Sequence, residues 1–95
     1  MKHLKPSTQY KKDVKKILNN HAKLEALRNI LSKLENEQPI PPEYSPHLLA
    51  GDYRGCMECH IKGDFLLIWF DPNTDQIDLL RLGSHSELFG KGKKR

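Results

Sequence analysis

A chain of 95 residues, of which 37% are hydrophobic, has room for one domain with a modest core. Its formal charge of +4 favours a polyanion or an acidic protein as partner, although a charge of this size equally serves solubility. The longest apolar run, residues 65–70, is far too short to span a bilayer, and no apolar run follows the charged N-terminal residues as in a signal peptide. We therefore expect no membrane association and a cytosolic protein whose thiols stay reduced.

The N-terminal third predicts a short strand and two amphipathic helices. His3 and Leu4 fit a strand, and Ser7 or Thr8 can cap a helix because either hydroxyl accepts a backbone N–H. Apolar residues form one stripe of the first helix: Tyr10, Val14, Ile17 and Leu18. Lysines occupy its opposite face: Lys11, Lys12, Lys15 and Lys16. A break at Asn19-Asn20 precedes a second apolar stripe over residues 24–34, so we expect a helical hairpin that ends near residue 36.

Prolines and turn residues divide the rest of the chain. Repeated prolines in residues 38–46 rule out a helix or a central strand there and indicate a connector. Residues 53–61, 65–70 and 76–82 read as strands, and a serine after Gly83 can open a last helical turn. The predicted fold class is α+β, with a helical hairpin packed on a small antiparallel sheet in the order (β)ααβββ. One domain spans residues 1–95, with a basic tail at 91–95.

Side chains suited to proton transfer and phosphate binding gather near the ends of the last strands. His60 lies at the end of one strand, Asp64 follows in the turn, and Arg81 and His85 lie at the end of another strand. In a small meander these groups can meet at one edge. Imidazoles move protons near neutral pH and a guanidinium neutralises phosphate charge, which are the groups that RNA cleavage needs. Taken alone, His60 would read as a surface histidine.

Several of these residues have simpler interpretations. In a regular strand Arg81 shares a face with Ile77 and Leu79, so its charge needs a partner, either Asp64 in a structural salt bridge or a ligand phosphate. His85 could be a loop or capping residue. Phe89 could pack in the core or stack on a base. Spacing gives His47 no partner, because it follows the proline-rich connector.

Two cysteines and a histidine form a C-x-x-C-H sequence at residues 56–60, the pattern that attaches c-type haem. Haem attachment normally occurs outside the cytoplasm. Residues three apart in a strand lie roughly 10 Å apart and point to opposite faces, whereas a disulfide tolerates at most about 7 Å between Cα atoms. We therefore expect buried or half-buried thiols and no cofactor. Metal-binding patterns such as H-E-x-x-H are also absent, although three histidines from separate loops could still form a site.

Three blocks of sequence resemble a known family. Residues 44–51 contain H-x-L-x-G, residues 58–68 contain H-x-x-x-D-x-L-L, and residues 81–90 contain R-x-G-S-H-S-x-L-F. In this order the blocks are similar to those of the YafQ branch of the RelE superfamily, which are bacterial type II toxins. The resemblance covers nearly the whole chain and implies a RelE-like fold. It departs at Gly63 and Phe65, where the family often has Pro and Trp around the acid.

The resemblance implies a ribosome-dependent mRNA endonuclease that cuts the message in the A site and is held inactive by a cognate antitoxin. It places the functional positions at His47, His60, Asp64, Arg81, His85 and Phe89. RNA supplies its own nucleophile in the 2′-OH, so the reaction needs an acid, a base and a cation but no metal. His85 is the best candidate for the acid, His60 or Asp64 for the base with His47 assisting, and Arg81 for the phosphate.

Two alternatives to an active toxin stay open at this point. The chain could be an RNA- or ribosome-binding module whose polar cluster is structural, or a toxin-like protein that has lost toxicity and survives as a binding partner. Every family position carries a residue of the expected type, which favours the enzyme. The lysine-rich first helix and the basic tail would contact ribosomal RNA and attract an acidic antitoxin.

Overall fold

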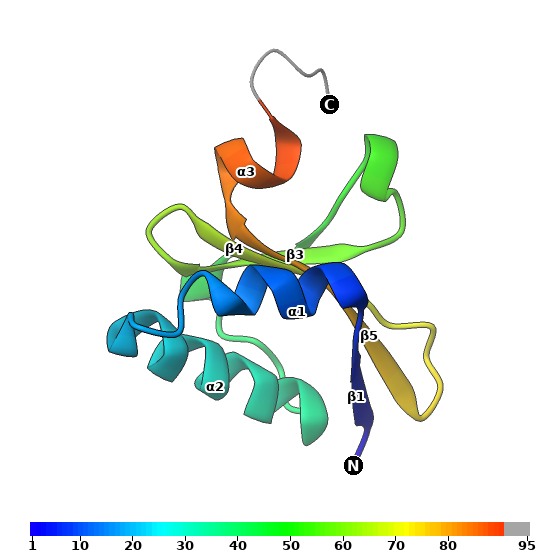
Figure 1. Cartoon of the computed structure of the whole chain (residues 1–95). Helices are drawn as coiled ribbons and strands as arrows, with labels where there is room; N and C mark the ends of the chain where they lie inside the picture. Colours follow the sequence, from blue (N-terminus) through cyan, green and yellow to red (C-terminus); the bar gives the residue numbers. More distant parts are fainter. Residues whose placement is uncertain (91–95) are drawn as a thin grey trace.

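The computed structural model describes residues 1–90, and the predicted basic tail at 91–95 lies outside the described residues. The main elements are β1 (His3–Pro6), α1 (Thr8–Lys15), α2 (His21–Glu35), β2 (His47–Leu48), β3 (Met57–Lys62), β4 (Phe65–Phe70), β5 (Gln76–Ser84) and α3 (His85–Phe89). Short 3₁₀ turns, η1 (Pro42–Tyr44) and η2 (Gly51–Tyr53), flank β2. Figure 1 shows α1 and α2 together on one side of the strands and α3 on the other. The predicted α+β class is confirmed, and no helix within residues 1–90 is long and apolar enough to cross a membrane.

Both long helices begin where the sequence offers a cap. The Ser7 hydroxyl accepts the Tyr10 N–H at 3.0 Å, and the Asn20 side chain accepts the Lys23 N–H at 3.1 Å. The first helix ends at Lys15, three residues before the end of the predicted apolar stripe. Leu18 is consequently 54% exposed, so its assignment to the buried stripe was wrong.

The strands form one five-stranded sheet in the order β1-β5-β4-β3-β2. Strands β3, β4 and β5 make the predicted antiparallel meander. Two edge strands complete the sheet: β1, which contains the predicted strand residues His3 and Leu4, and β2, which the sequence did not indicate. β1 pairs with β5 in parallel, which makes the sheet mixed, and β2 at the end of the proline-rich connector pairs antiparallel with β3. The connector therefore delivers His47 directly to the sheet.

Two separate apolar clusters hold the two faces of the sheet. The larger cluster joins α1 and α2 to alternate residues of β4, namely Phe65, Leu67 and Trp69. The smaller cluster takes the intervening residues Leu66 and Ile68, together with Cys56 and Leu88. β4 is thus buried on both faces, as its continuous apolar run predicted.

A bulge in β5 and the position of α1 together shape the free edge of that strand. Ile68 pairs with Arg81 and Trp69 with Leu79, so Leu80 is an extra residue without a cross-strand partner. β1 reaches only as far as Leu79, and α1 covers the edge beyond it. There the Ser7 hydroxyl donates to the Leu80 carbonyl at 3.0 Å. The edge is therefore closed by side chains of α1 rather than by another strand.

Candidate active site

The face of the sheet opposite α1 and α2 carries the candidate catalytic residues. Cross-strand partners point to the same side of a sheet, and Glu58, Ile68 and Arg81 are paired in one row across β3, β4 and β5. His60, Leu66 and Gly83 form the next row. Since Leu66 and Ile68 belong to the smaller cluster, the polar residues of both rows lie on its face. The bulge moves Arg81 there and away from Ile77 and Leu79, so the prediction that these three share a face was wrong.

Strand β2 places His47 against a buried acid. His47 pairs with Glu58 in the sheet, and its Nε2 lies 3.0 Å from Oε1 of Glu58. Its Nδ1 lies 2.7 Å from the carbonyl oxygen of Ser45, which has a left-handed φ of 49° after η1. The rings of His47 and His60 are 6.3 Å apart. The turn at Ser45 therefore orients one imidazole toward Glu58 and beside a second imidazole.

The contacts of His47 join an imidazole to a buried carboxylate. Its Nδ1 lies against a carbonyl oxygen, which can only accept a hydrogen bond, and its Nε2 lies against the carboxylate. Glu58 is 4% exposed, and within residues 1–90 its Oε2 is buried without a hydrogen-bond partner. An imidazole and a carboxylate can both transfer protons, so the pair is a candidate for acid–base chemistry.

The sequence did not single out Glu58 as a functional residue. In the predicted strand Glu58 shares a face with His60, and this shared face could have indicated that Glu58 belongs to the site. Its burial depends on the pairing of β2 with β3, and two residues of connector are too few for a pattern to reveal that pairing.

The short helix α3 presents His85 and Phe89. The Ser84 hydroxyl accepts the Glu87 N–H at 3.2 Å and the Glu87 carboxylate accepts the Ser84 N–H at 2.7 Å, which completes a capping box. A Cβ at Gly83 would lie 2.9 Å from Oε1 of Glu87, so glycine leaves the room that this box requires. His85 is exposed, and its ring centroid is 4.9 Å from that of Phe89.

A hollow of about 180 Å³ brings these elements together. It is lined by His47, Leu49, Ala50, Glu58, His85 and Phe89. Three of the predicted site residues therefore surround one cavity, with His60 beside His47 and Arg81 on the same face of the sheet. Asp64 does not line the hollow and lies exposed in the turn between β3 and β4. That turn lies at the end of the sheet where Phe65 pairs with Ser84.

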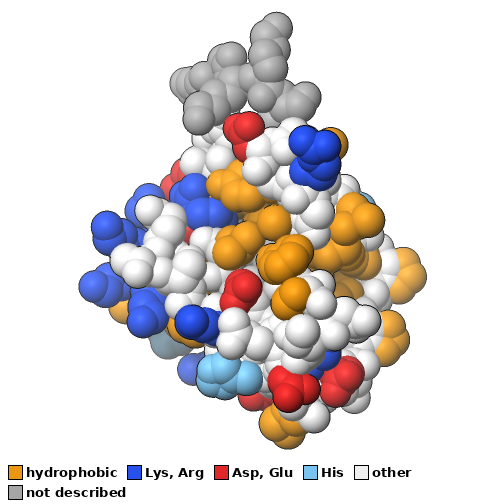
Figure 2. Space-filling model, turned by 90° about the vertical axis from the view of Figure 1, so that its right-hand side faces the viewer, with side chains coloured by type: hydrophobic (Ala, Val, Ile, Leu, Met, Phe, Trp, Pro, Cys, Tyr) orange, Lys and Arg blue, Asp and Glu red, His pale blue; other side chains and the backbone are white. Residues whose placement is uncertain are grey.

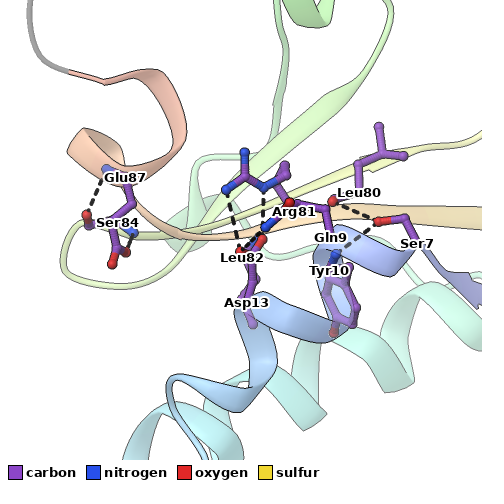
Figure 3. A network of polar contacts seen from close by, with 9 residues as sticks. All are labelled: Ser7, Gln9, Tyr10, Asp13, Leu80, Arg81, Leu82, Ser84 and Glu87. Atoms are coloured by element: carbon purple, nitrogen blue, oxygen red, sulfur yellow. Dashed lines mark hydrogen bonds and ion pairs between the residues drawn. The ribbon is translucent and has the colours of Figure 1, made fainter.

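The charge partner of Arg81 is Asp13 from α1, so the salt bridge with Asp64, one of the two alternatives that the sequence left open, is not formed. Nε of Arg81 donates to Oδ2 of Asp13 at 2.9 Å, and the backbone N–H of Leu82 donates to the same oxygen at 2.9 Å (Figure 3). Burial raises the pKa of the Asp13 carboxyl, but the hydrogen bonds from Arg81, Leu82 and Gln9 outweigh it and bring the pKa below its usual range. Asp13 is thus a buried carboxylate.

The position of Asp13 in the sequence could have indicated that its carboxylate is buried. It lies three residues after Tyr10 and four before Ile17, which puts an acid on the apolar stripe of a lysine-rich helix. An acid in the apolar stripe of a helix needs a charge partner, and so does a single arginine in a strand. Each residue is therefore a candidate partner for the other. Only the tertiary structure shows that the two elements meet.

The two cysteines lie on opposite faces of the sheet, as the strand geometry predicted. Cys59 belongs to the larger cluster and Cys56 to the smaller one, and both are buried free thiols. Burial, with a smaller contribution from the charge of Glu58, raises the pKa of Cys59 to about 12. Within residues 1–90 no three side chains of His, Cys, Asp or Glu converge in a way that could hold a metal ion.

Basic and apolar side chains are separated on the surface beside the site. Figure 2 shows Lys and Arg side chains grouped on the side of α1 and hydrophobic side chains in the centre of the view. The exposed lysines of the α1 segment are Lys11, Lys12, Lys15 and Lys16. The side of α1 opposite Asp13 therefore offers a positive surface to a polyanion.

The chain is similar to known proteins over nearly its whole length. A profile of the family described as "Bacterial toxin of type II toxin-antitoxin system, YafQ" matches residues 2–90. The mRNA interferase toxin YafQ of Escherichia coli strain K12 is 35% identical over 86 residues, covering 88% of this chain and 91% of the relative. A solved metal-bound toxin from Helicobacter pylori is 38% identical, with a TM-score of 0.83 over 94% of this chain and 100% of the other. The Escherichia coli DinJ–YafQ toxin–antitoxin complex gives 31% identity and a TM-score of 0.82, over 94% and 98% of the two chains.

Proposed function

The chain belongs to the YafQ family of bacterial toxins of type II toxin–antitoxin systems, and we propose that it is a ribosome-dependent endonuclease that cleaves mRNA in the A site. The observation that carries the proposal is the hollow lined by the His47–Glu58 pair, His85 and Phe89. It brings imidazoles, a carboxylate and an aromatic ring together in one accessible hollow. A toxin with this target acts in the cytoplasm.

The reaction needs a proton acceptor for the 2′-OH of the nucleotide that is cut. The His47–Glu58 pair is favoured as this base, because both residues line the hollow and the two side chains are in contact at 3.0 Å. His60 stands beside His47 and supports the same role. Asp64 is a weaker candidate for the base, because it is exposed in a turn outside the hollow.

Cleavage follows from the placement of the remaining groups. As the base takes the 2′-OH proton, the 2′ oxygen attacks the adjacent phosphorus and the bond from phosphorus to the 5′ oxygen breaks. The imidazolium of His85 donates a proton to that leaving oxygen, and Arg81 stabilises the charge on the phosphate. The products are a 2′,3′-cyclic phosphate and a 5′-OH. Phe89, next to His85, is positioned to stack on a base.

Two macromolecular partners follow from the same surface. The exposed lysines of the α1 segment suit ribosomal RNA, whose phosphates carry the opposite charge. The relative in the DinJ–YafQ complex has an antitoxin partner, which supports a cognate antitoxin for this chain. An acidic antitoxin that covers α1 or the hollow would keep the enzyme inactive.

The test is cleavage of mRNA on purified ribosomes by the wild type, His85→Ala and the control His3→Ala. His3 is an exposed histidine at the far end of the sheet, where β1 pairs with Gln76. We expect the wild type and the control to cut in the A site, and His85→Ala to cut about 100-fold more slowly or less, the range for loss of a general acid. Folding is checked by circular dichroism. A folded wild type that binds ribosomes and leaves the message intact would identify a binding module instead.

A further inference from the structure

We propose that Asp13 is a positioning residue, which holds the Arg81 guanidinium from α1 in the orientation that meets the scissile phosphate. The inference rests on the proposed function, because it assigns Asp13 a part in phosphate recognition. Asp13 has no place in the hollow and touches none of the groups proposed to move protons. Its action is through Arg81 alone.

The carboxylate of Asp13 is a built receptor for hydrogen-bond donors. Oδ2 accepts from Nε of Arg81 and from the N–H of Leu82, both at 2.9 Å. Oδ1 accepts from Nε2 of Gln9 at 3.2 Å and lies 3.4 Å from Nη2 of Arg81. These donors approach the two oxygens from α1 and from β5 (Figure 3). The carboxylate is therefore fixed on all sides.

Arg81 is anchored at one end and accessible at the other. The side chain of Asp13 is 2% exposed, whereas that of Arg81 is 21% exposed. Asp13 binds Nε and one edge of the guanidinium, so N–H groups remain for a further acceptor. Tyr53 is close enough to contribute to the raised pKa of Arg81, after the larger contribution of Asp13, and its ring meets that of Phe89 edge-on at 5.8 Å. The exposed end of Arg81 is thus next to the aromatic wall of the site.

A purely structural role would not require this arrangement. The N–H of Leu82 at the strand edge needs a single acceptor, which a neutral side chain could supply. Asp13 adds a negative charge that pairs with Arg81, and a second oxygen that Arg81 Nη2 shares with Gln9. A buried ion pair is by itself weak support for stability, because desolvation offsets the attraction. Its benefit here is orientation, since the Arg81 side chain loses its rotational freedom during folding rather than when the phosphate binds.

The experiment is a double-mutant cycle with Asp13→Asn and Arg81→Lys. Asparagine keeps the size of the side chain but replaces an acceptor with a donor that faces other donors. Lysine keeps the charge opposite Asp13 but has no planar fork to orient. Single-turnover cleavage of ribosome-bound mRNA is measured for the wild type, both single variants and the double variant. Asp75→Asn, in an exposed turn, is the control.

We expect Asp13→Asn to slow cleavage by 10- to 100-fold, on the order of the loss that follows a misplaced catalytic group. In the Arg81→Lys background the same change should alter the rate less than about 3-fold, because there is no fork left to misplace. An equal slowing in both backgrounds would overturn the inference and make Asp13 a structural residue. Thermal unfolding of all four proteins shows that the compared molecules are folded.

A binding measurement separates this inference from the proposed function. If the folded wild type fails to cleave, the proposed function is wrong, and the cycle is read instead from the Kd for a short RNA with 2′-O-methyl riboses, which cannot be cut. Weaker binding by Asp13→Asn only when Arg81 is present supports the positioning role. The positioning role is overturned if Asp13→Asn weakens RNA binding equally in the wild-type and Arg81→Lys backgrounds, or does not weaken it at all.

Discussion

The helix-covered face of the sheet and the face that carries the hollow bury their side chains differently. The helix-covered face holds an apolar cluster that joins α1 and α2 to three strands. Within residues 1–90, the cluster on the opposite face contains four buried apolar residues, and the neighbouring strand positions hold Glu58, His60 and Arg81. One well-packed face can therefore maintain the fold while the other tolerates polar groups that cost stability.

Asp13 connects the two faces of the sheet through its ion pair with Arg81. It belongs to the helix that covers the larger cluster, yet its carboxylate pairs with an arginine whose strand position belongs to the other face. The link passes around the free edge of β5, where the bulge at Leu80 changes the alternation of side chains. A bulge next to a functional residue thus changes the direction of one side chain.

The largest effect is expected when the buried acid of the site face loses its charge. Glu58→Gln removes the proposed base without changing its volume, so cleavage should fall by about 100-fold or more. The free energy of unfolding should rise by on the order of 1 kcal/mol, because a buried carboxylate with an unpartnered oxygen is costly. Ribosome cleavage and urea unfolding measure the two changes.

The matched control for this variant is Glu43→Gln, at an exposed position in η1. It should change neither cleavage nor stability. If Glu58→Gln lost stability and kept activity, Glu58 would be a structural residue and the contrast between the faces would fail.

Two adjacent leucines of β4 test the faces directly. Leu67 and Leu66 are both 0% exposed, but Leu67 packs under the helices and Leu66 under the site. Each change to alanine should lower the free energy of unfolding by about 2–5 kcal/mol. At a temperature where both variants stay folded, Leu66→Ala should also slow cleavage, because it loosens the row that holds His60 and Gly83. Loss of activity in Leu67→Ala alone would reverse this interpretation.

The smallest expected effect is a loss of stability at alkaline pH, caused by buried groups on the helix-covered face. Burial raises the pKa of Cys59 to about 12 and, together with the charge of Asp13, that of Tyr10 to about 12. Each group keeps its proton in the folded state after the unfolded chain has lost it, so stability is complete below pH 9 and falls as the pH rises toward 12. The slope is up to about 1.4 kcal/mol per pH unit for one group.

Urea unfolding between pH 7 and pH 10.5 measures this loss. Cys59→Ala should show a shallower fall above pH 9, since the contribution of Cys59 is then lost and those of Tyr10 and Cys56 remain. A fall of unchanged slope in Cys59→Ala would mean that other groups cause the alkaline instability.

Local patterns in the chain were sufficient for most of the elements. A cap at Ser7 or Thr8, a break at Asn19-Asn20, apolar stripes and the run 65–70 predicted two helices and the central strand, because these signals depend on residues close in sequence. Turn residues separated the strands of the meander for the same reason. A short strand at His3 and Leu4 was predicted, but its parallel pairing with β5 was not. The two residues of β2 are too few to show a period, so the link between His47 and Glu58 did not emerge.

The sequence by itself determined the α+β class, the antiparallel meander and the resemblance to a toxin family. That resemblance gave the candidate positions His47, His60, Asp64, Arg81, His85 and Phe89. Only the tertiary structure decided that Arg81 pairs with Asp13, that Glu58 is buried beside His47, and that Asp64 stays outside the hollow. The physical reason is the sequence separation over which each interaction acts. Caps and periodicity act within a few residues, whereas a bulge, an edge closed by a helix and a charge pair across 68 residues exist only after the chain has folded.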